Sequence, residues 1–265
     1  MQIEMCSLFS GSTGNCIYLN MGGTHLLVDA GLPARNILLS LQNIGISAQD
    51  ISAILVTHEH SDHIRGLGAL ARKLRVPIYA NSATWAAMET KVGMLDLANI
   101  RMFSTNEDFY IGDVGVDPFS IPHDAADPVG FCFHCRNRKA SILTDLGHTN
   151  DTILEKVAHS DIMALEANHD EAMLRRGPYP ARLKQRILGR RGHLSNAAAA
   201  EALVELVGTG LQGVLLSHLS QENNVPETAF HTVVETLSAA GIQEGRDVRV
   251  EVAPPRNMSQ VFMIS

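Results

Sequence analysis

Four potential metal ligands stand close together near position 60 of the sequence. His58, His60, Asp62 and His63 fall within six consecutive residues. Neutral imidazole and carboxylate are the side chains that suit zinc, manganese or iron. Alternate residues of an extended segment point to the same side, so His58 and His60 can reach one ion. A helix that starts directly afterwards would turn Asp62 and His63 toward a neighbouring position. The segment can therefore serve two adjacent ions.

This motif lies where a predicted strand meets a predicted helix. Residues 51–57 form a short apolar run typical of a buried strand, and apolar residues recur at helical spacing over 64–74. Further strands are predicted at 3–9, 16–20, 25–29, 162–165, 213–217 and 248–252, and helices at 33–41, 195–207 and 227–239. The region 99–144 is strand-rich, with a hairpin turn at 136–139. Strands in both halves with helices between them favour two sheets packed face to face and covered by helices.

The overall composition is that of a globular protein. The 265 residues are 45% hydrophobic and 18% charged, which excludes a disordered or fibrous chain. We find no repeat, low-complexity tract or linker, so the sequence predicts one domain over 1–265. The net charge of −7 argues against an indiscriminate nucleic-acid binder, because phosphate binding usually requires a basic excess. The chain is unusually rich in histidine, with 12 in 265 residues.

The cysteines and the N-terminal residues predict a cytoplasmic protein. Four cysteines in a chain of this length do not form a disulfide scaffold. Cys132 and Cys135 make a C-x-x-C pair, but on a strand these two thiols point to opposite faces and cannot share a metal. No signal peptide is visible, and no run of 18 apolar residues predicts a membrane span.

The motif resembles that of the metallo-β-lactamase fold superfamily. Other pieces of that pattern follow in the expected order at 26–31, 121–125, 144–147 and 216–220. The resemblance implies an α/β (α+β) fold, specifically a four-layer αββα sandwich with a two-metal site between two mixed sheets. It assigns His58, His60 and His123 to one divalent ion, Asp62, His63 and His218 to a second, and Asp145 to the bridge between them. It also gives Asp29 the role of supporting the metal loop.

A closer resemblance is to the YycJ (WalJ) family of bacterial metal-dependent exonucleases that act on DNA. It runs nearly end to end and rests on residues 11–15, 57–63, 122–130, 166–170, 177–187, 192–196 and 218–224. It implies a DNA substrate and a role in DNA repair or maintenance. One departure is His148, which follows Gly147 where an aromatic residue is expected. His148 is therefore an extra group to place relative to the metals.

Two metal ions suit the hydrolysis of a phosphodiester. They lower the pKa of a shared water and neutralise the negative charge that develops on the phosphate, so a metal-bridging hydroxide would attack. Asp62 can bind one ion and accept a hydrogen bond from that hydroxide. The leaving alkoxide needs a proton, for which His193 is the candidate, and Glu166 can orient its imidazole. The alternatives are phosphate binding or packing for His193 and a structural hydrogen bond for Glu166.

A basic stretch leads into His193. Seven of the 21 cationic residues fall in the 17 positions from 175 to 191, and no Asp or Glu interrupts them. We expect a track for the DNA phosphates formed by Arg182, Lys184, Arg186, Arg190 and Arg191, against the alternative of a solvated helix face. Arg136, Arg138 and Lys139 are a candidate extension of that track. Tyr179 is either a base-stacking ring or a packing residue beside two prolines.

Several alternatives stay open at this point. A small-molecule or cyclic-nucleotide phosphodiesterase fits the same scaffold, as do a non-catalytic DNA-associating metal module and an iron redox protein, although the last lacks its partner domain. Zinc or manganese is the first expectation for the ions, and iron or nickel would also bind. Residues 168–170, Asn223 and Asn224 either contact substrate or support Glu166. The sequence leaves the oligomeric state open.

Overall fold

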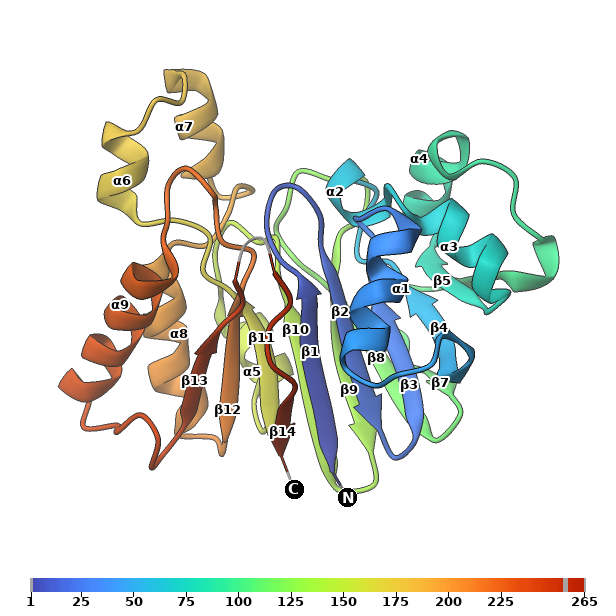
Figure 1. The fold of residues 1–265 in the computed structure, drawn as a ribbon. Helices are drawn as coiled ribbons and strands as arrows, with labels where there is room; N and C mark the ends of the chain where they lie inside the picture. Colours follow the sequence, from blue (N-terminus) through green and yellow to red (C-terminus); the bar gives the residue numbers. More distant parts are fainter. Residues whose placement is uncertain (1, 255–256, 265) are drawn as a thin grey trace.

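Two seven-stranded sheets lie face to face, with helices on both outer surfaces (Figure 1). The computed structural model describes residues 2–254 and 257–264. The first sheet has the order β14 (Phe262–Ile264), β1 (Ile3–Phe9), β2 (Cys16–Met21), β3 (Thr24–Val28), β4 (Ile51–Leu55), β5 (Ile78–Asn81) and β6 (Ile100–Phe103). The second has the order β13 (Arg249–Val252), β12 (Gly213–Ser217), β11 (Ile162–Glu166), β10 (Arg138–Leu143), β9 (Val129–Cys135), β8 (Val114–Ser120) and β7 (Phe109–Ile111).

Three apolar layers hold the sandwich together. The central layer joins the inner faces of the sheets and includes Leu26, Ala53, Phe131 and Ile142. On the first sheet, the outer layer lies beneath α1 (Ala34–Asn43), α3 (Leu67–Leu74) and α4 (Ser82–Val92). On the second, it lies beneath α5 (Asp151–Val157), α8 (Asn196–Val207) and α9 (Pro226–Ala239). The predicted αββα architecture is confirmed.

Both sheets are mixed, and their parallel parts set the position of the site. Strands β3 to β6 are parallel, as are β10 to β13, whereas the remaining pairings are antiparallel. The carboxyl ends of neighbouring parallel strands meet at one edge of a sheet, and the residues that follow them are brought together there. Segments that are distant in the sequence therefore share the edge at which α2 (Ser61–Ile64), α6 (Glu171–Arg176) and α7 (Ala181–Ile187) also lie (Figure 1).

Most predicted elements are present, and the differences have physical reasons. The strands at 3–9 and 213–217 have the predicted bounds. The helix predicted over 64–74 begins earlier and divides into α2 and α3 around Gly66. A Cβ on Gly66 would lie 1.7 Å from the carbonyl oxygen of Leu32, so the chain packs there at a distance that only glycine permits. The elements β5, β14, α4 and α5 were not anticipated.

The cysteine prediction is confirmed. Cys132 packs in the outer layer of the second sheet, and Cys135 packs in the central layer between the sheets. The two thiols therefore lie on opposite faces of β9, as their spacing on a strand requires. In a separate finding, no helix among the described residues has both the length and the hydrophobicity needed to span a bilayer.

Gly31 offers a test of the packing beneath the metal motif. A Cβ on Gly31 would lie 1.6 Å from the carbonyl oxygen of Asp62, so the backbone of one or the other must move. We expect Gly31→Ala to lower the free energy of unfolding by about 3 kcal/mol, measured by urea denaturation. The matched control is Gly115→Ala, whose Cβ would meet its nearest neighbour at 3.5 Å. Equal stability of the two variants would contradict this packing.

Candidate metal centre

All seven predicted metal ligands converge at the shared edge of the two sheets. The segment that follows β4 carries four of them, two before α2 and two within it, and the other three follow β8, β10 and β12. Four overlapping groups have ligand atoms within 4.8 Å of one another, and together they contain His58, His60, Asp62, His63, His123, Asp145 and His218, with Glu166 and His193 beside them. The structure thus brings together every residue to which the sequence assigned a metal or a catalytic step.

Three imidazoles form the first group. Nε2 of His58 lies 3.0 Å from Nδ1 of His60, and Nε2 of His123 lies 3.3 Å from that same Nδ1. A proton on His60 can satisfy only one of these two contacts, because each nitrogen atom holds a single proton. A cation at the centre would satisfy all three lone pairs. Burial and the charge of His63 lower the pKa of His58, which keeps its imidazole neutral and able to bind a metal.

Two carboxylates and two imidazoles form the second group. Nε2 of His63 lies 3.5 Å from Oδ2 of Asp62 and 3.2 Å from Oδ2 of Asp145. Nε2 of His218 lies 3.8 Å from Oδ2 of Asp62. The other oxygen of Asp145, Oδ1, lies 3.9 Å from Nε2 of His123, so this carboxylate extends between the two groups.

Hydrogen bonds at Nδ1 direct three of the imidazoles into the site. Nδ1 of His63 donates to Oδ2 of Asp29 at 2.7 Å, and Nδ1 of His123 donates to the carbonyl oxygen of Gly192 at 3.2 Å. Nδ1 of His218 donates to Oε1 of Glu166 at 2.6 Å. Such contacts set the tautomer and turn Nε2 toward the other ligand atoms, as is usual for histidines that bind metals.

Two buried atoms of the second group fit a cation. Oδ2 of Asp145 and Nε2 of His218 are buried and have no hydrogen-bond partner among the described residues. Burial disfavours a charged imidazole, but Asp145, Asp62 and Glu166 outweigh it and raise the pKa of His218 to about 10. The site therefore attracts positive charge, and a divalent ion would displace the proton as it binds.

The backbone is strained at three of these positions. Asp29, Asp145 and His218 have φ angles of 64°, 60° and 60°, in the left-handed region that residues other than glycine seldom adopt. Each follows the carboxyl end of a parallel strand. Strain of this kind persists only where surrounding structure enforces it, and it gathers at functional sites. Here it turns each side chain from its strand toward the common edge.

Glu166 joins two histidines. Its Oε1 accepts hydrogen bonds from Nδ1 of His193 at 2.9 Å and from Nδ1 of His218. Its Oε2 accepts from the backbone N–H groups of Leu146 and Leu194 at 2.9 and 3.0 Å. Burial opposes ionisation of Glu166, but the charge and hydrogen bond of His193 and the hydrogen bond of His218 lower its pKa to about 2. Glu166 is thus an ionised, fully bonded support and not an open metal ligand.

A cavity of about 270 Å³ opens beside these groups. One wall contains ligand residues and His193, and the opposite wall comes from α7 and the turn before it. The lining residues are Ser12, His60, Asp62, Asp145, Asn168, Tyr179, Leu183, Arg186, Ile187, His193, His218 and Ser220. Tyr179 therefore faces the cavity and is not confined to packing between the prolines.

The basic candidates have different surroundings, although all lie on or next to α7. Arg186 lines the cavity and donates from Nε to Oδ2 of Asp124 at 2.6 Å. Lys184 donates to the carbonyl oxygen of Arg175, and Arg191 donates to that of His123. Nη2 of Arg190 lies 3.2 Å from Nε2 of His148. Arg182 is exposed.

Other candidates lie away from the ligands. His148 contacts Arg190 through both ring nitrogens and belongs to none of the ligand groups found among the described residues. Arg138 and Lys139 are the first two residues of β10, whereas Asp145 follows the opposite end of that strand. Arg138 pairs with Asp161 at 2.6 Å. The hairpin therefore does not extend the basic track, and that expectation is wrong.

The residues next to Glu166 mainly support the backbone. Asn168 donates from Nδ2 to the carbonyl oxygen of His218 at 2.8 Å and also lines the cavity. Asp170 caps α6 through the N–H of Met173. Asn224 donates to the carbonyl oxygen of Ala167 at 2.9 Å. Of the open candidates, Asn168 alone combines a supporting contact with access to the cavity among the described residues.

Sequence reasoning missed two residues of the site. Nδ2 of Asn15 donates to Nε2 of His63 at 3.0 Å, and Asp124 lies between His123 and Arg186. Asn15 closes the turn at 11–15, and this role in the turn gave no sign of its contact with His63. Asp124 directly follows a predicted ligand, and this adjacency is the signal that could have identified it.

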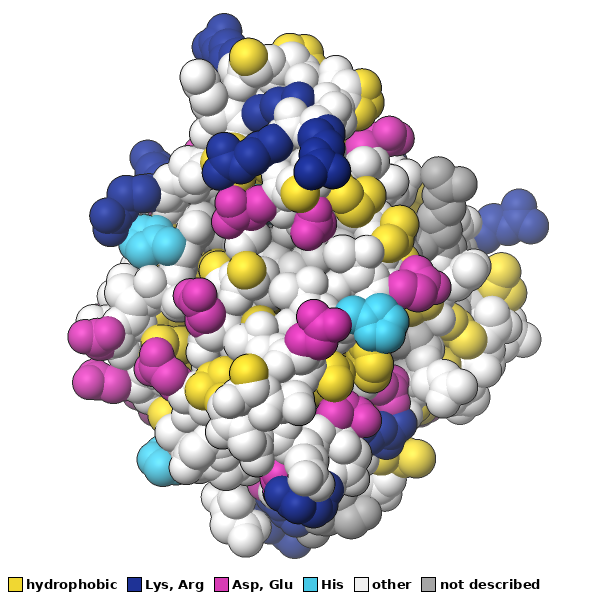
Figure 2. Space-filling model, turned by 90° about the vertical axis from the view of Figure 1, so that its left-hand side faces the viewer, with side chains coloured by type: hydrophobic (Ala, Val, Ile, Leu, Met, Phe, Trp, Pro, Cys, Tyr) yellow, Lys and Arg dark blue, Asp and Glu magenta, His cyan; other side chains and the backbone are white. Residues whose placement is uncertain are grey.

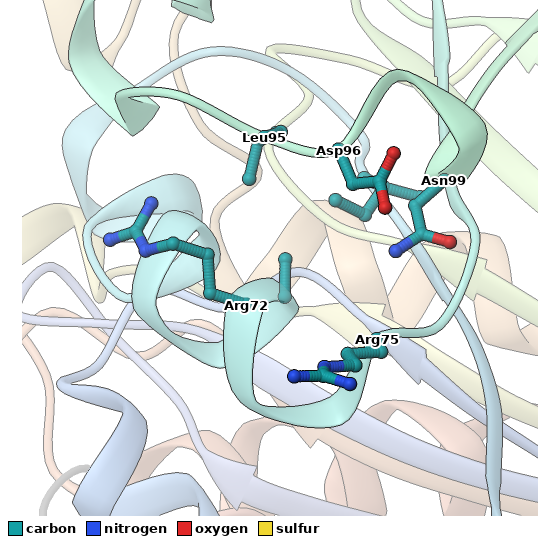
Figure 3. Close-up of a pocket in the computed structure, with 7 residues that line it drawn as sticks. Arg72, Arg75, Leu95, Asp96 and Asn99 are labelled. Carbon is teal, nitrogen blue, oxygen red and sulfur yellow. The ribbon is translucent and has the colours of Figure 1, made fainter.

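Another pocket, of about 260 Å³, lies between α3 and the loop around residues 95–99 (Figure 3). Two of its polar side chains bond to the backbone around the pocket. Nη1 of Arg72 donates to the carbonyl oxygens of Val92 and Met94, and Asp96 accepts from the N–H of Ala98. This pocket therefore contributes to loop structure, and its lining residues belong to none of the ligand groups found among the described residues.

Comparisons with known proteins agree with the geometry. A profile described as "Beta-lactamase superfamily domain" matches residues 24–219, and the chain belongs to this family. The chain is 38% identical over 261 residues to Exodeoxyribonuclease YycJ of Bacillus anthracis, covering 98% of this chain and 99% of that protein. It is 42% identical over 250 residues to Exodeoxyribonuclease WalJ of Streptococcus pneumoniae, covering 94% and 93%. Its fold matches the metallo-beta-lactamase fold protein YhfI of Bacillus subtilis with a TM-score of 0.73 at 16% identity, covering 97% and 99%.

Asp29 provides a test of how the ligands are held. Its carboxylate accepts from Nδ1 of His63 and from the N–H and hydroxyl of Thr57. We expect Asp29→Asn to weaken Zn²⁺ binding about 10- to 100-fold, because the orientation and basicity of His63 change while asparagine tolerates the backbone angle. Competition with a chelating dye measures this affinity. Asp50→Asn, which alters a surface cap, is the control, and unchanged affinity in Asp29→Asn would contradict the role.

Proposed function

We propose that this protein is a two-metal nuclease that hydrolyses phosphodiester bonds of DNA, acting as an exonuclease in the cytoplasm and in DNA repair or maintenance. The observation that carries the proposal is the convergence of seven imidazole and carboxylate ligands beside a cavity that Arg186 also lines. The near full-length similarity to proteins named exodeoxyribonucleases supports the reaction and the substrate. We also propose that residues 1–265 act as one domain.

Two ions would be held by the two ligand groups. We assign His58, His60 and His123 to one ion, Asp62, His63 and His218 to the other, and Asp145 to both, since its two oxygens face different groups. Zinc or manganese is the first choice for this mixture of nitrogen and oxygen ligands, and iron or nickel would also fit. When bound, such a pair activates a water and neutralises charge on the phosphate.

His193 is our candidate for the proton donor to the leaving oxygen. Its Nδ1 is held by Glu166, its ring lines the cavity, and its Nε2 bonds to none of the residues the structure describes. A carboxylate partner raises the proton affinity of an imidazole and sets its direction. Glu166 thereby orients His193 and His218 together. Asp62, a member of the second group that also lines the cavity, would bind metal and accept a hydrogen bond from the attacking water.

The basic side chains give the cavity its preference for a polyanion. Figure 2 shows Lys and Arg gathered over α6 and α7 at the top of the molecule, with Asp and Glu more frequent below. Cationic side chains on one face attract the DNA backbone even when the net charge is negative. We assign Arg182, Lys184, Arg186, Arg190 and Arg191 to this contact. The second candidate, a phosphodiesterase for small or cyclic substrates, would need only the metal site and the adjacent cavity.

Charge reversal outside the cavity distinguishes the DNA nuclease from the phosphodiesterase for small or cyclic substrates. Arg182→Glu combined with Arg190→Glu alters two exposed residues that do not line the cavity. We expect this variant to cleave end-labelled DNA at least about tenfold more slowly, because phosphate contacts are lost, while turnover of bis(p-nitrophenyl) phosphate stays near that of the wild type. Asp145→Ala should lose both activities. Equal DNA cleavage by the wild type and the charge-reversed variant would favour the small-diester enzyme.

Two substrates with different leaving groups distinguish proton donation by His193 from a role in binding or packing. His193→Ala should lower kcat on DNA about 10²- to 10⁴-fold, because the departing alkoxide then lacks its proton donor. A p-nitrophenolate leaving group is stable without a proton, so kcat on bis(p-nitrophenyl) phosphate should fall much less. Steady-state kinetics on both substrates measures the difference. The same loss on both would assign His193 to binding or packing instead.

A further inference from the structure

Asp124 ties α7 to the loop that carries His123. Its Oδ2 accepts the hydrogen bond from Nε of Arg186 at 2.6 Å. Its Oδ1 is buried, has no hydrogen-bond partner among the described residues, and lies 3.5 Å from Nε2 of His123. The carboxylate therefore stands between the three-imidazole group and the helix that forms the opposite wall of the cavity.

The contact leaves most of the Arg186 guanidinium available. A guanidinium has five N–H donors, of which Asp124 takes the one on Nε. The Nη atoms donate to no residue in the described part of the chain, and their four N–H groups suit two oxygens of one phosphate. Arg186 lines the cavity together with Asp62 and His193. A phosphate that enters the cavity would meet a guanidinium whose direction is already set.

Other hydrogen bonds also hold the α7 region against the loop that carries His123. The segment after α7 is fastened to the same loop, because Nε of Arg191 donates to the carbonyl oxygen of His123 and Nδ1 of His123 donates to that of Gly192. The Arg186 side chain is itself 56% exposed, and without Asp124 it would sample many rotamers. Restricting it before the substrate arrives reduces the conformational entropy lost on binding.

We propose that Asp124 is a positioning residue that holds Arg186 at the edge of the metal site, where Arg186 binds a non-bridging phosphate oxygen of the DNA strand being cleaved. The inference rests on the proposed nuclease function and extends it to a residue outside the seven ligands and the basic stretch. Electrostatic repulsion between Asp124 and phosphate would change the affinity for DNA in the opposite direction. The negative charge of Asp124 would repel phosphate if Arg186 made no use of the contact, and its removal would then strengthen DNA binding.

A double-mutant cycle tests the proposal. The variants are Asp124→Asn, Arg186→Gln, their combination, and Asp127→Asn as the control. Asp127 lies on the same loop and carries the same charge, but it accepts from the hydroxyl of Thr105 at 2.8 Å and is not bonded to Arg186. KM and kcat are measured on an end-labelled DNA oligonucleotide, and bound metal is measured by mass spectrometry.

We expect Asp124→Asn to raise KM about threefold to fivefold, with kcat changing less than KM and metal content unchanged. Arg186→Gln should raise KM further, and the combined variant should match Arg186→Gln alone, because Asp124 acts only through the guanidinium. Asp127→Asn should resemble the wild type.

Three results would overturn the inference. They are a lower KM in Asp124→Asn, independent effects of the two substitutions, and loss of bound metal in Asp124→Asn, which would make Asp124 a ligand. Failure of the wild-type protein to cleave DNA would instead overturn the proposed nuclease function.

Discussion

Hydrogen bonds between imidazole Nδ1 atoms and buried acceptors are the interactions on which the site depends. Asp29 holds His63, and Glu166 holds both His193 and His218. A buried carboxylate is stable only where donors surround it, so these contacts cannot be lost without a large cost in stability. Because each histidine commits one nitrogen to the scaffold, its other nitrogen is directed into the same small volume. That volume is where a cation can bind.

The arrangement concentrates unfavourable features that the rest of the fold must outweigh. Lone pairs of His58, His60 and His123 face one another, and Asp145 and His218 adopt left-handed backbone angles. The apolar layers between and outside the two sheets supply the stabilisation that keeps these residues in place. A bound cation would remove part of the conflict, so metal binding and folding stability are expected to be linked.

The second wall of the cavity connects the ligand groups with the residues proposed to contact the substrate. Helix α7 belongs to neither sheet, yet Arg191 and Gly192 bond directly to His123. The residue that follows them is His193, whose imidazole is held by Glu166. One segment therefore carries cationic side chains, a wall of the cavity and the proposed proton donor. Because the cationic side chains are concentrated in this segment, a chain with a net charge of −7 can present a cationic surface beside the ligand groups.

Local sequence alone determined the features that depend on period and spacing. These include the strands at 3–9 and 213–217, the opposite faces of Cys132 and Cys135, and the ligand motif at 58–63. The family pattern then supplied the distant ligands. Only the tertiary structure revealed that the pattern over 64–74 breaks at a glycine, that Glu166 serves two histidines, and that Asp124 holds Arg186. Asp124 and Arg186 are 62 positions apart, and periodicity carries no information about contacts at such a separation. Their meeting depends on how the loop after β8 and the segment after β11 are brought to one edge by the packing of two sheets.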